Sequence, residues 1–142
     1  MATLNSALSA SASALNAERT RIEVAVSNLA NAESTRGPDG QPYRRRDVVL
    51  APDTPSPFEE ALGQASTGGV KVAGIIEDQS PFKRRFDPSH PDADADGFVA
   101  MPNVDTPEEM VNMLSATRAY QANLSAIGLI RELVQKALEL GK

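Results

Sequence analysis

The sequence predicts a mainly α-helical fold in which two long terminal helices pack as a coiled coil and flank a small β insertion. Apolar residues recur every seven positions near both ends of the 142-residue chain, a spacing typical of paired helices. Between the ends, residues 37–102 hold nine of the ten prolines and seven of the nine glycines, which excludes a long helix there. We therefore expect helical segments at 1–36 and 105–142, which together form one domain, and a short-stranded, irregular insertion at 37–104.

The N-terminal helix is expected over residues 4–32. Its apolar series is Leu8, Leu15, Ile22 and Leu29. Serines weaken the first half as a helix former, so this half is expected to be largely disordered in a free monomer and to fold on a partner. Asn28 and Asn31 lie in the last turns, where asparagine tolerates the left-handed conformation that ends many helices.

The insertion is expected to contain loops and a small hairpin-like β unit. Residues 43–50 and 70–77 have the length and the β-branched content of strands. One or two helical turns fit residues 57–62. Residues 81–96 are expected to be mostly irregular, and residues 98–101 to be extended.

The C-terminal helix has a clear predicted start. Thr106 would be the N-cap, Pro107 the first helical residue, and Glu109 the third residue of a capping box. The apolar repeat then continues to Leu140, and Gly141 would cap the helix. One seven-residue series contains Met113, Tyr120, Ile127 and Val134, and a second, offset by three or four positions, contains Met110, Leu124 and Leu138.

Polar residues interrupt these apolar series at Arg19, Thr117 and Arg131. Polar residues in a helical seam cost stability but can fix its register. The alternative is that the seam rotates so that Leu114, Ile130 and Leu133 fill it, while the arginines extend to its rim.

Composition and charge argue against several functional classes. The net charge of −5 and the pI near 4.9 argue against a general nucleic-acid-binding protein. The chain has one histidine and no cysteine, and it has neither a nucleophile elbow nor a phosphate-binding loop motif, so we expect neither enzymatic activity nor a cofactor. The first eighteen residues hold no Lys or Arg, and no apolar run is long enough to cross a bilayer, so neither a secretory signal nor a membrane span is expected.

An acidic segment offers an alternative function. Asp92, Asp94, Asp96 and Gly97 match the first half of a calcium-binding EF-hand loop, but Asn103 stands where a bidentate Glu is required. The alternative is therefore a calcium- or anion-binding interaction module, and the simpler interpretation is a solvated acidic loop. The basic runs at 44–46 and 83–85 are best interpreted as charged strand edges, or as partners of this loop in a neighbouring subunit.

Two terminal segments resemble a known family. Residues 27–35 (SNLANAEST) and 116–123 (ATRAYQAN) resemble the terminal signatures of bacterial flagellar rod and hook proteins. Segments 40–45, 72–78 and 87–104 resemble the proximal-rod branch of that family, so the similarity covers nearly the whole chain. The signature residues are Asn28, Asn31, Thr35, Tyr43, Arg44, Asp92, Asp94, Asp96, Gly97 and Asn103.

The resemblance implies a structural subunit of the flagellar basal-body rod, without catalytic residues, cofactor or metal. In that family the terminal helices pack in the wall of a periplasm-spanning drive shaft, which transmits torque from motor to hook. Export would use the flagellar type III apparatus without a cleaved signal peptide. The implied partners are the chain itself, related rod subunits, and export-apparatus or MS-ring components at the base, with no nucleic acid and no membrane insertion.

The residues expected to carry assembly are the apolar ones of both helices. They are Leu8, Leu15, Ile22, Leu29, Met113, Tyr120, Leu124, Ile127 and Val134. Segments 43–46 and 92–97 are expected to make subunit-specific contacts.

Overall fold

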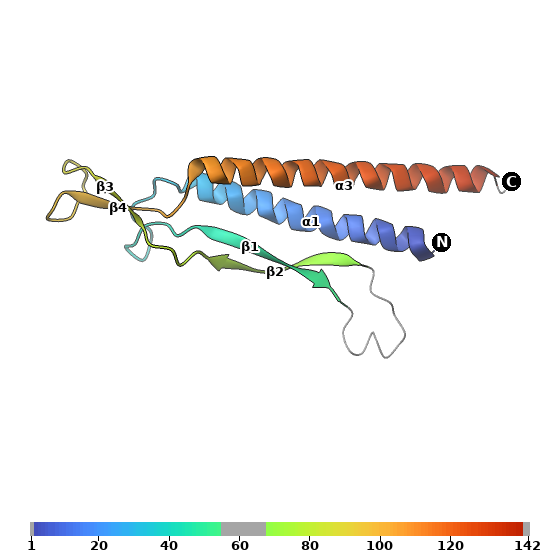
Figure 1. The fold of residues 1–142 in the computed structure, drawn as a ribbon, viewed down its shortest axis with the longest axis horizontal. Helices are drawn as coiled ribbons and strands as arrows, with labels where there is room; N and C mark the ends of the chain where they lie inside the picture. Colours follow the sequence, from blue (N-terminus) through green and yellow to red (C-terminus); the bar gives the residue numbers. More distant parts are fainter. Residues whose placement is uncertain (1, 55–67, 141–142) are drawn as a thin grey trace. The chain divides into compact units, whose positions relative to one another are not determined.

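A computed structural model of the chain describes residues 2–54 and 68–140, and it confirms a mainly helical fold with a small β insertion (Figure 1). The elements in chain order are α1 (Ala2–Ala30), β1 (Arg46–Asp53), β2 (Gly69–Glu77), β3 (Lys83–Phe86), β4 (Phe98–Met101) and α3 (Thr106–Leu140). The strands form two separate two-stranded sheets, β1 with β2 and β3 with β4. No helix in the described ranges is both long and apolar enough to cross a membrane.

The chain forms two compact units, and both long helices contribute to each. The first, which we call the terminal unit, comprises residues 1–20, 49–74 and 115–142. The second, the central unit, comprises residues 21–48 and 75–114.

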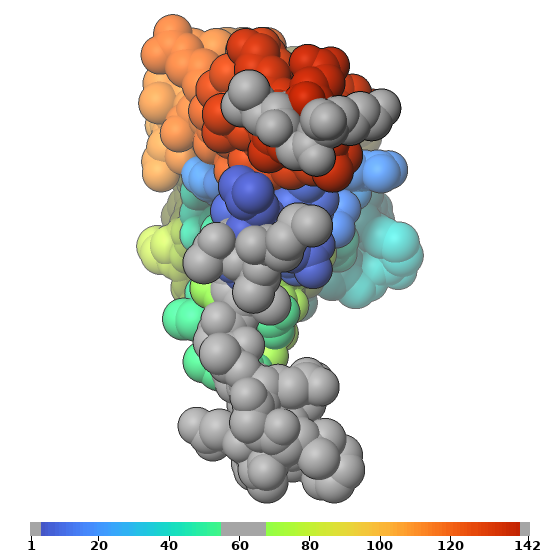
Figure 2. All heavy atoms as spheres, turned by 90° about the vertical axis from the view of Figure 1, so that its right-hand side faces the viewer, coloured from blue at the N-terminus to red at the C-terminus, as the bar shows by residue number. Residues whose placement is uncertain are grey.

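In the terminal unit, the start of α1 lies between the end of α3 and the β1–β2 ribbon (Figures 1 and 2). Ala17 and Ala116 are buried there, so small side chains lie in the interior of this unit. Ser13 joins α1 to the ribbon, because its Oγ accepts a hydrogen bond from Val70 N at 3.1 Å. Any side chain at Gly69 would place its Cβ 2.9 Å from that same oxygen. The serine-rich half of α1 therefore packs on partners within its own chain.

In the central unit, β3 and β4 form an antiparallel hairpin in which Lys83 pairs with Met101 and Phe86 with Phe98. Val99 and Met101 supply its buried side. Gly97 precedes β4 with φ of 81°, a left-handed conformation that favours glycine. Residues 81–96 are mostly irregular as expected; the exception is β3, where strand pairing with β4 overrides the weak local preference of the sequence KRRF.

The start of α3 agrees with the sequence prediction, but its cap does not. Asp105 serves as the cap, since its Oδ1 accepts a hydrogen bond from Glu108 N at 3.3 Å. The predicted capping box is therefore wrong, because the Glu109 side chain turns away to other partners. The predicted N-terminal helix, residues 4–32, corresponds to α1 at Ala2–Ala30.

The end of α1 and the first strand also differ from expectation in detail. No described non-glycine residue has a positive φ; instead, Asn31 Nδ2 donates to Ser27 O at 2.9 Å. Strand β1 begins three residues later than predicted, whereas β2 and β4 agree closely with their predicted ranges. The predictions of a helical turn at 57–62 and of a glycine cap at 141 lie outside the described residues.

Candidate functional site

The apolar residues predicted to carry assembly fall into two groups. Eight are half-buried within the single chain: Leu8, Leu15, Ile22, Leu29, Met113, Tyr120, Ile127 and Val134. The ninth, Leu124, is 55% exposed. The first predicted series on α3 therefore faces the protein interior, together with the buried or half-buried residues Glu109, Ala116, Asn123 and Ile130 that alternate with it.

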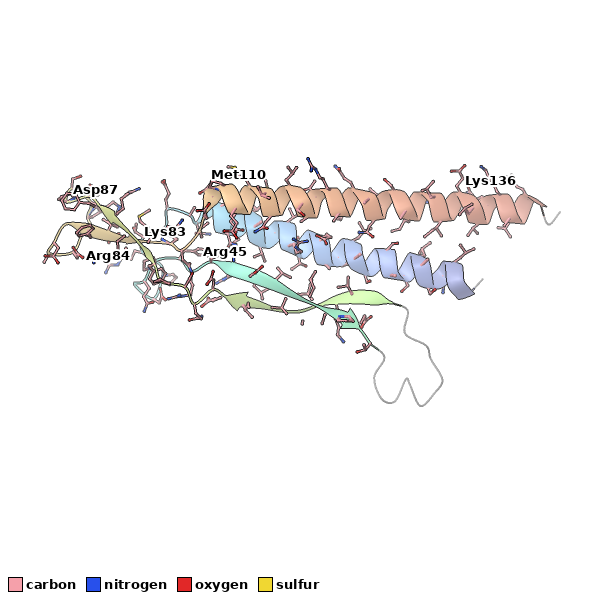
Figure 3. The ribbon with its side chains drawn as sticks, in the orientation of Figure 1. Arg45, Lys83, Arg84, Asp87, Met110 and Lys136 are labelled. Atoms are coloured by element: carbon pink, nitrogen blue, oxygen red, sulfur yellow. The ribbon has the colours of Figure 1, made fainter. Side chains whose placement is uncertain are left out.

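The second series on α3 faces solvent. Met110 is 53% exposed and Leu138 is 61% exposed, and Met110 projects from the edge of the helix in Figure 3. Four further apolar residues of α3 are at least half exposed, namely Val111, Leu114, Leu129 and Leu133. Neither sequence interpretation of the seam is complete. Arg131 is exposed, so it does not lie in the seam, and of the residues expected to replace the polar ones, only Ile130 is half-buried, while Leu114 and Leu133 are exposed. Leu138 lies eighteen residues, or five turns, after Tyr120 and therefore on the side of the half-buried series. We call the other six exposed residues the outer face of α3.

Asn28 is the centre of a buried polar network in the central unit. Its side chain is 1% exposed. Its Oδ1 accepts hydrogen bonds from Arg46 N at 3.0 Å and from the Tyr43 hydroxyl at 2.9 Å. Its Nδ2 donates to Arg46 O at 2.8 Å and to Glu109 Oε2 at 3.0 Å. One amide thus joins α1, the loop before β1, and α3.

Glu109 brings a charge into this network. Glu109 is 2% exposed, and its Oε1 accepts a hydrogen bond from Arg45 Nε at 2.6 Å. Such a buried carboxylate requires a cation and hydrogen bonds to offset its lost hydration. Burial lowers the pKa of Arg45, but the hydrogen bond and the negative charge of Glu109 outweigh it, and the net effect is a raised pKa. Arg45 therefore stays charged at any physiological pH. Figure 3 labels Arg45.

Asn103 extends the network to the loop that follows β2. Its Oδ1 accepts from Arg45 N at 2.8 Å, and its Nδ2 donates to Ser80 Oγ at 2.9 Å and to Asp78 O at 3.1 Å. Arg44 also donates to Asp78 O, at 3.0 Å, and its guanidinium lies 4.4 Å from the centre of the Phe82 ring. Four of the signature residues, Asn28, Tyr43, Arg44 and Asn103, therefore meet around one segment.

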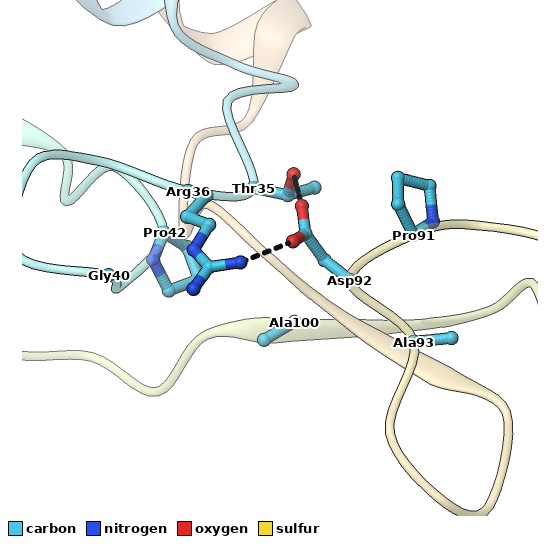
Figure 4. Close-up of a pocket in the computed structure, with 8 residues that line it drawn as sticks. All are labelled: Thr35, Arg36, Gly40, Pro42, Pro91, Asp92, Ala93 and Ala100. Carbon is cyan, nitrogen blue, oxygen red and sulfur yellow. Dashed lines mark hydrogen bonds and ion pairs between the residues drawn. The ribbon is translucent and has the colours of Figure 1, made fainter.

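The remaining signature residues lie in two smaller clusters of the central unit. Thr35 Oγ1 donates to Asp92 Oδ2 at 2.8 Å, and Arg36 Nη1 lies 3.4 Å from Asp92 Oδ1 (Figure 4). These three residues line a cavity of about 270 Å³ with Gly40, Pro42, Pro91, Ala93 and Ala100. Asn31 Oδ1 accepts from Ser34 Oγ at 3.2 Å, so the segment after α1 is held by its own side chains.

The acidic segment 92–97 is organised by protein donors. Asp94 Oδ1 accepts from Phe98 N at 2.8 Å and from Asp96 N at 3.0 Å, and Oδ2 pairs with Arg84 at 2.8 Å. These backbone hydrogen bonds, Phe98 first, lower the pKa of Asp94. Asp92 and Asp94 thus bind different protein groups. Within residues 2–54 and 68–140, no three His, Cys, Asp or Glu side chains gather as metal ligands.

Glu109 and Arg45 were not singled out as site residues from the sequence. Glu109 was assigned to a capping box because it has the right spacing from Thr106, and Arg45 was one of three consecutive arginines. Only the fold separates their roles, since Arg45 is largely buried while its neighbour Arg46 is half exposed.

Comparison with known proteins is consistent across the chain. A family model described as "Flagella basal body rod protein" matches residues 1–38, and one described as "Flagellar basal body rod FlgEFG protein C-terminal" matches residues 95–140. The flagellar basal-body rod protein FlgC of Salmonella typhimurium is 52% identical over 92% of each chain. FlgC of Escherichia coli O157:H7 is 50% identical over 92% of each chain, and FlgC of Bacillus subtilis is 45% identical over 95% of this chain and 96% of its own. With identity this high over nearly the full length of each relative, the chain belongs to the FlgC family of flagellar basal-body rod proteins.

Proposed function

We propose that this chain polymerises through its terminal helices with copies of itself and related rod subunits, and so forms part of the periplasm-spanning shaft that transmits torque from motor to hook. The observation that carries this proposal is the outer face of α3. Its six large apolar side chains remain at least half exposed in the single chain. Apolar surface of this extent typically marks a protein interaction site.

The outer face suits contact between rigid subunits. It belongs to a 35-residue helix whose opposite side already packs within the chain, so the helix presents its apolar residues in a fixed arrangement. Burying a large apolar side chain completely contributes about 1.5–3 kcal/mol, and these residues still have half or more of that to gain. Assembly by packing requires no bond chemistry, and the function we propose is mechanical.

Segments 43–46 and 92–97 are proposed to add subunit-specific contacts. Much of their polar surface is already used within the chain, but Arg46 and Asp96 remain exposed. Their charges can discriminate between neighbouring surfaces without being a main source of affinity.

The route of delivery follows from the family resemblance. We propose export through the flagellar type III apparatus without a cleaved signal peptide, with contacts to the export apparatus or MS ring at the rod base. Purification of basal bodies, followed by mass spectrometry, should recover the chain with the rod and hook components. Its restriction to the soluble fraction of flagellated cells would contradict the rod assignment.

The decisive variant is Leu124→Asp. Because Leu124 is 55% exposed, the change should lower the free energy of unfolding of the purified chain by only about 1–2 kcal/mol, from the part of the leucine already buried and from the lower helix propensity of aspartate. In an assembled rod the same carboxylate would be buried without a partner, so we expect loss of basal bodies in electron micrographs and loss of swimming in soft agar.

The matched control is Ser125→Asp, which adds the same charge to the next residue of α3, where the side chain is exposed and already polar. It should swim. A motile Leu124→Asp strain would remove the outer face from the proposal, and equal loss of motility in both variants would indicate a general effect of charge on α3.

A further inference from the structure

The contact between Asn28 and Glu109 joins α1 and α3 across 81 residues of sequence, inside the central unit. We propose that these two are positioning residues that set the axial register of α1 against α3. Within a single chain, register is thus set by a buried polar pair that lies outside the apolar series.

The apolar series alone define the register poorly. Leu8, Leu15, Ile22 and Leu29 repeat every seven residues, as do the half-buried residues of α3, so a slip by one repeat again places apolar side chains opposite one another. Arg19 and Arg131, the arginines expected in the seam, are exposed. A unique register therefore needs a contact that a slipped arrangement cannot form.

Asn28 provides such a contact, because each of its polar atoms has two partners. Two of the four hydrogen bonds hold both backbone groups of Arg46, one binds Tyr43 and one binds Glu109. One turn earlier in α1, Val24 and Ala25 offer neither a side-chain donor nor an acceptor; one repeat earlier, Arg21 offers donors but no acceptor. A one-turn slip would leave the carboxylate of Glu109 and the peptide group of Arg46 without these partners, and a slip by one repeat would still leave Arg46 N without an acceptor; such buried groups are costly when unpaired.

A role in specificity also explains why the network is charged. A buried ion pair is commonly no more stabilising than apolar side chains of similar size, because the charges lose their hydration. Buried polar residues between helices are best attested as determinants of register. The network of Asn28, Arg45 and Glu109 has this character, since its members are 1–14% exposed and no buried polar side-chain atom among the described residues lacks a partner.

The test separates register from stability. The chain has no cysteine, so Val26→Cys and Val111→Cys, at exposed positions of α1 and α3 within the central unit, can carry a single pair of spin labels. In the otherwise natural full-length chain we expect one narrow distance between the labels. In the triple variant Asn28→Leu, Arg45→Met, Glu109→Leu we expect retained helical circular dichroism, with additional distances shifted by about 5 Å for each turn of slip.

The control is Val99→Ala, which creates a cavity in the buried side of the hairpin and leaves the network intact. It should lower the melting temperature and keep the single distance. A single, natural distance in a folded triple variant would overturn the proposal, as would new distances in Val99→Ala, which would attribute the effect to stability alone.

If the triple variant does not fold, Asn28→Ala serves in its place, since alanine preserves the helix while removing all four hydrogen bonds. It too must show the additional distances. A single distance in a folded Asn28→Ala chain would equally overturn the proposal.

Discussion

The two units of this chain are stabilised in different ways. The central unit contains eight Lys or Arg against thirteen Asp or Glu, a net charge of −5, and buries an ion pair at its centre. The terminal unit contains six of each, a net charge of zero, and its buried residues include the small alanines Ala17 and Ala116. The central unit is specified by its own hydrogen bonds, whereas the terminal unit has no net charge; both units expose large apolar side chains. Neutral, apolar surfaces can approach copies of themselves without like-charge repulsion.

The largest expected effect on stability comes from breaking the buried ion pair of the central unit. Glu109→Ala should lower the free energy of unfolding by about 3 kcal/mol, because it removes an acceptor of Asn28 Nδ2 and the shortest carboxylate contact of Arg45, leaving Asp47, Asp78 and Glu108 at 3.7–3.8 Å. Urea denaturation measures the change.

Lys136→Ala is the matched comparison in the terminal unit. It breaks an exposed pair with Glu132 at 2.9 Å, for which about 0.3–0.5 kcal/mol is expected. Equal losses in the two variants would mean that burial does not distinguish the ion pairs of the two units.

A smaller effect is expected from the turn before β4. Gly97→Ala should cost about 2 kcal/mol, because a left-handed residue with a Cβ is strained and that Cβ would lie 3.0 Å from Phe86 Cε2. Gly40 has φ of 78° with no atom within 4 Å of such a Cβ, so Gly40→Ala isolates the backbone strain, about 1 kcal/mol. Thermal denaturation compares the two variants. A Gly40→Ala chain less stable than Gly97→Ala would show that crowding against Phe86 is unimportant.

Acid is expected to have the smallest effect on stability of the changes considered, and this effect should fall on the central unit. Hydrogen bonds from Ser80 lower the pKa of Asp78, and those from Phe98 and Asp96 lower the pKa of Asp94. A carboxyl whose folded pKa lies below its unfolded pKa of about 3.9 adds stability above that pH, and this stability is lost as pH falls through the folded pKa.

We therefore expect the melting temperature to fall between about pH 4 and pH 2, and to fall less steeply in Asp94→Asn. An identical acid profile for Asp94→Asn would exclude this carboxyl as a contributor. Because Asp94 is exposed, the difference should be modest.

The sequence allowed the fold to be predicted better than the site. Heptad spacing located both helices, since periodicity is a local property, but it could not tell which of the two series on α3 faces inward. β1 was placed three residues early because residues 43–45 have strand-like composition, yet Tyr43 and Arg45 use their side chains in the network. Glu109 has the spacing of a capping box, but its carboxylate accepts hydrogen bonds from Asn28 and Arg45 instead. Contacts that span 18 to 81 residues have no signature in a single sequence.

The bond pattern of Asn28 has one more consequence, which concerns strand pairing. An asparagine amide has the same donor and acceptor as a peptide group, and here it occupies both backbone groups of Arg46, the first residue of β1. The helix thereby blocks one position on the open edge of a two-stranded sheet, where another chain could otherwise add a strand. An isolated chain is thereby protected at this position from strand pairing with another copy of itself.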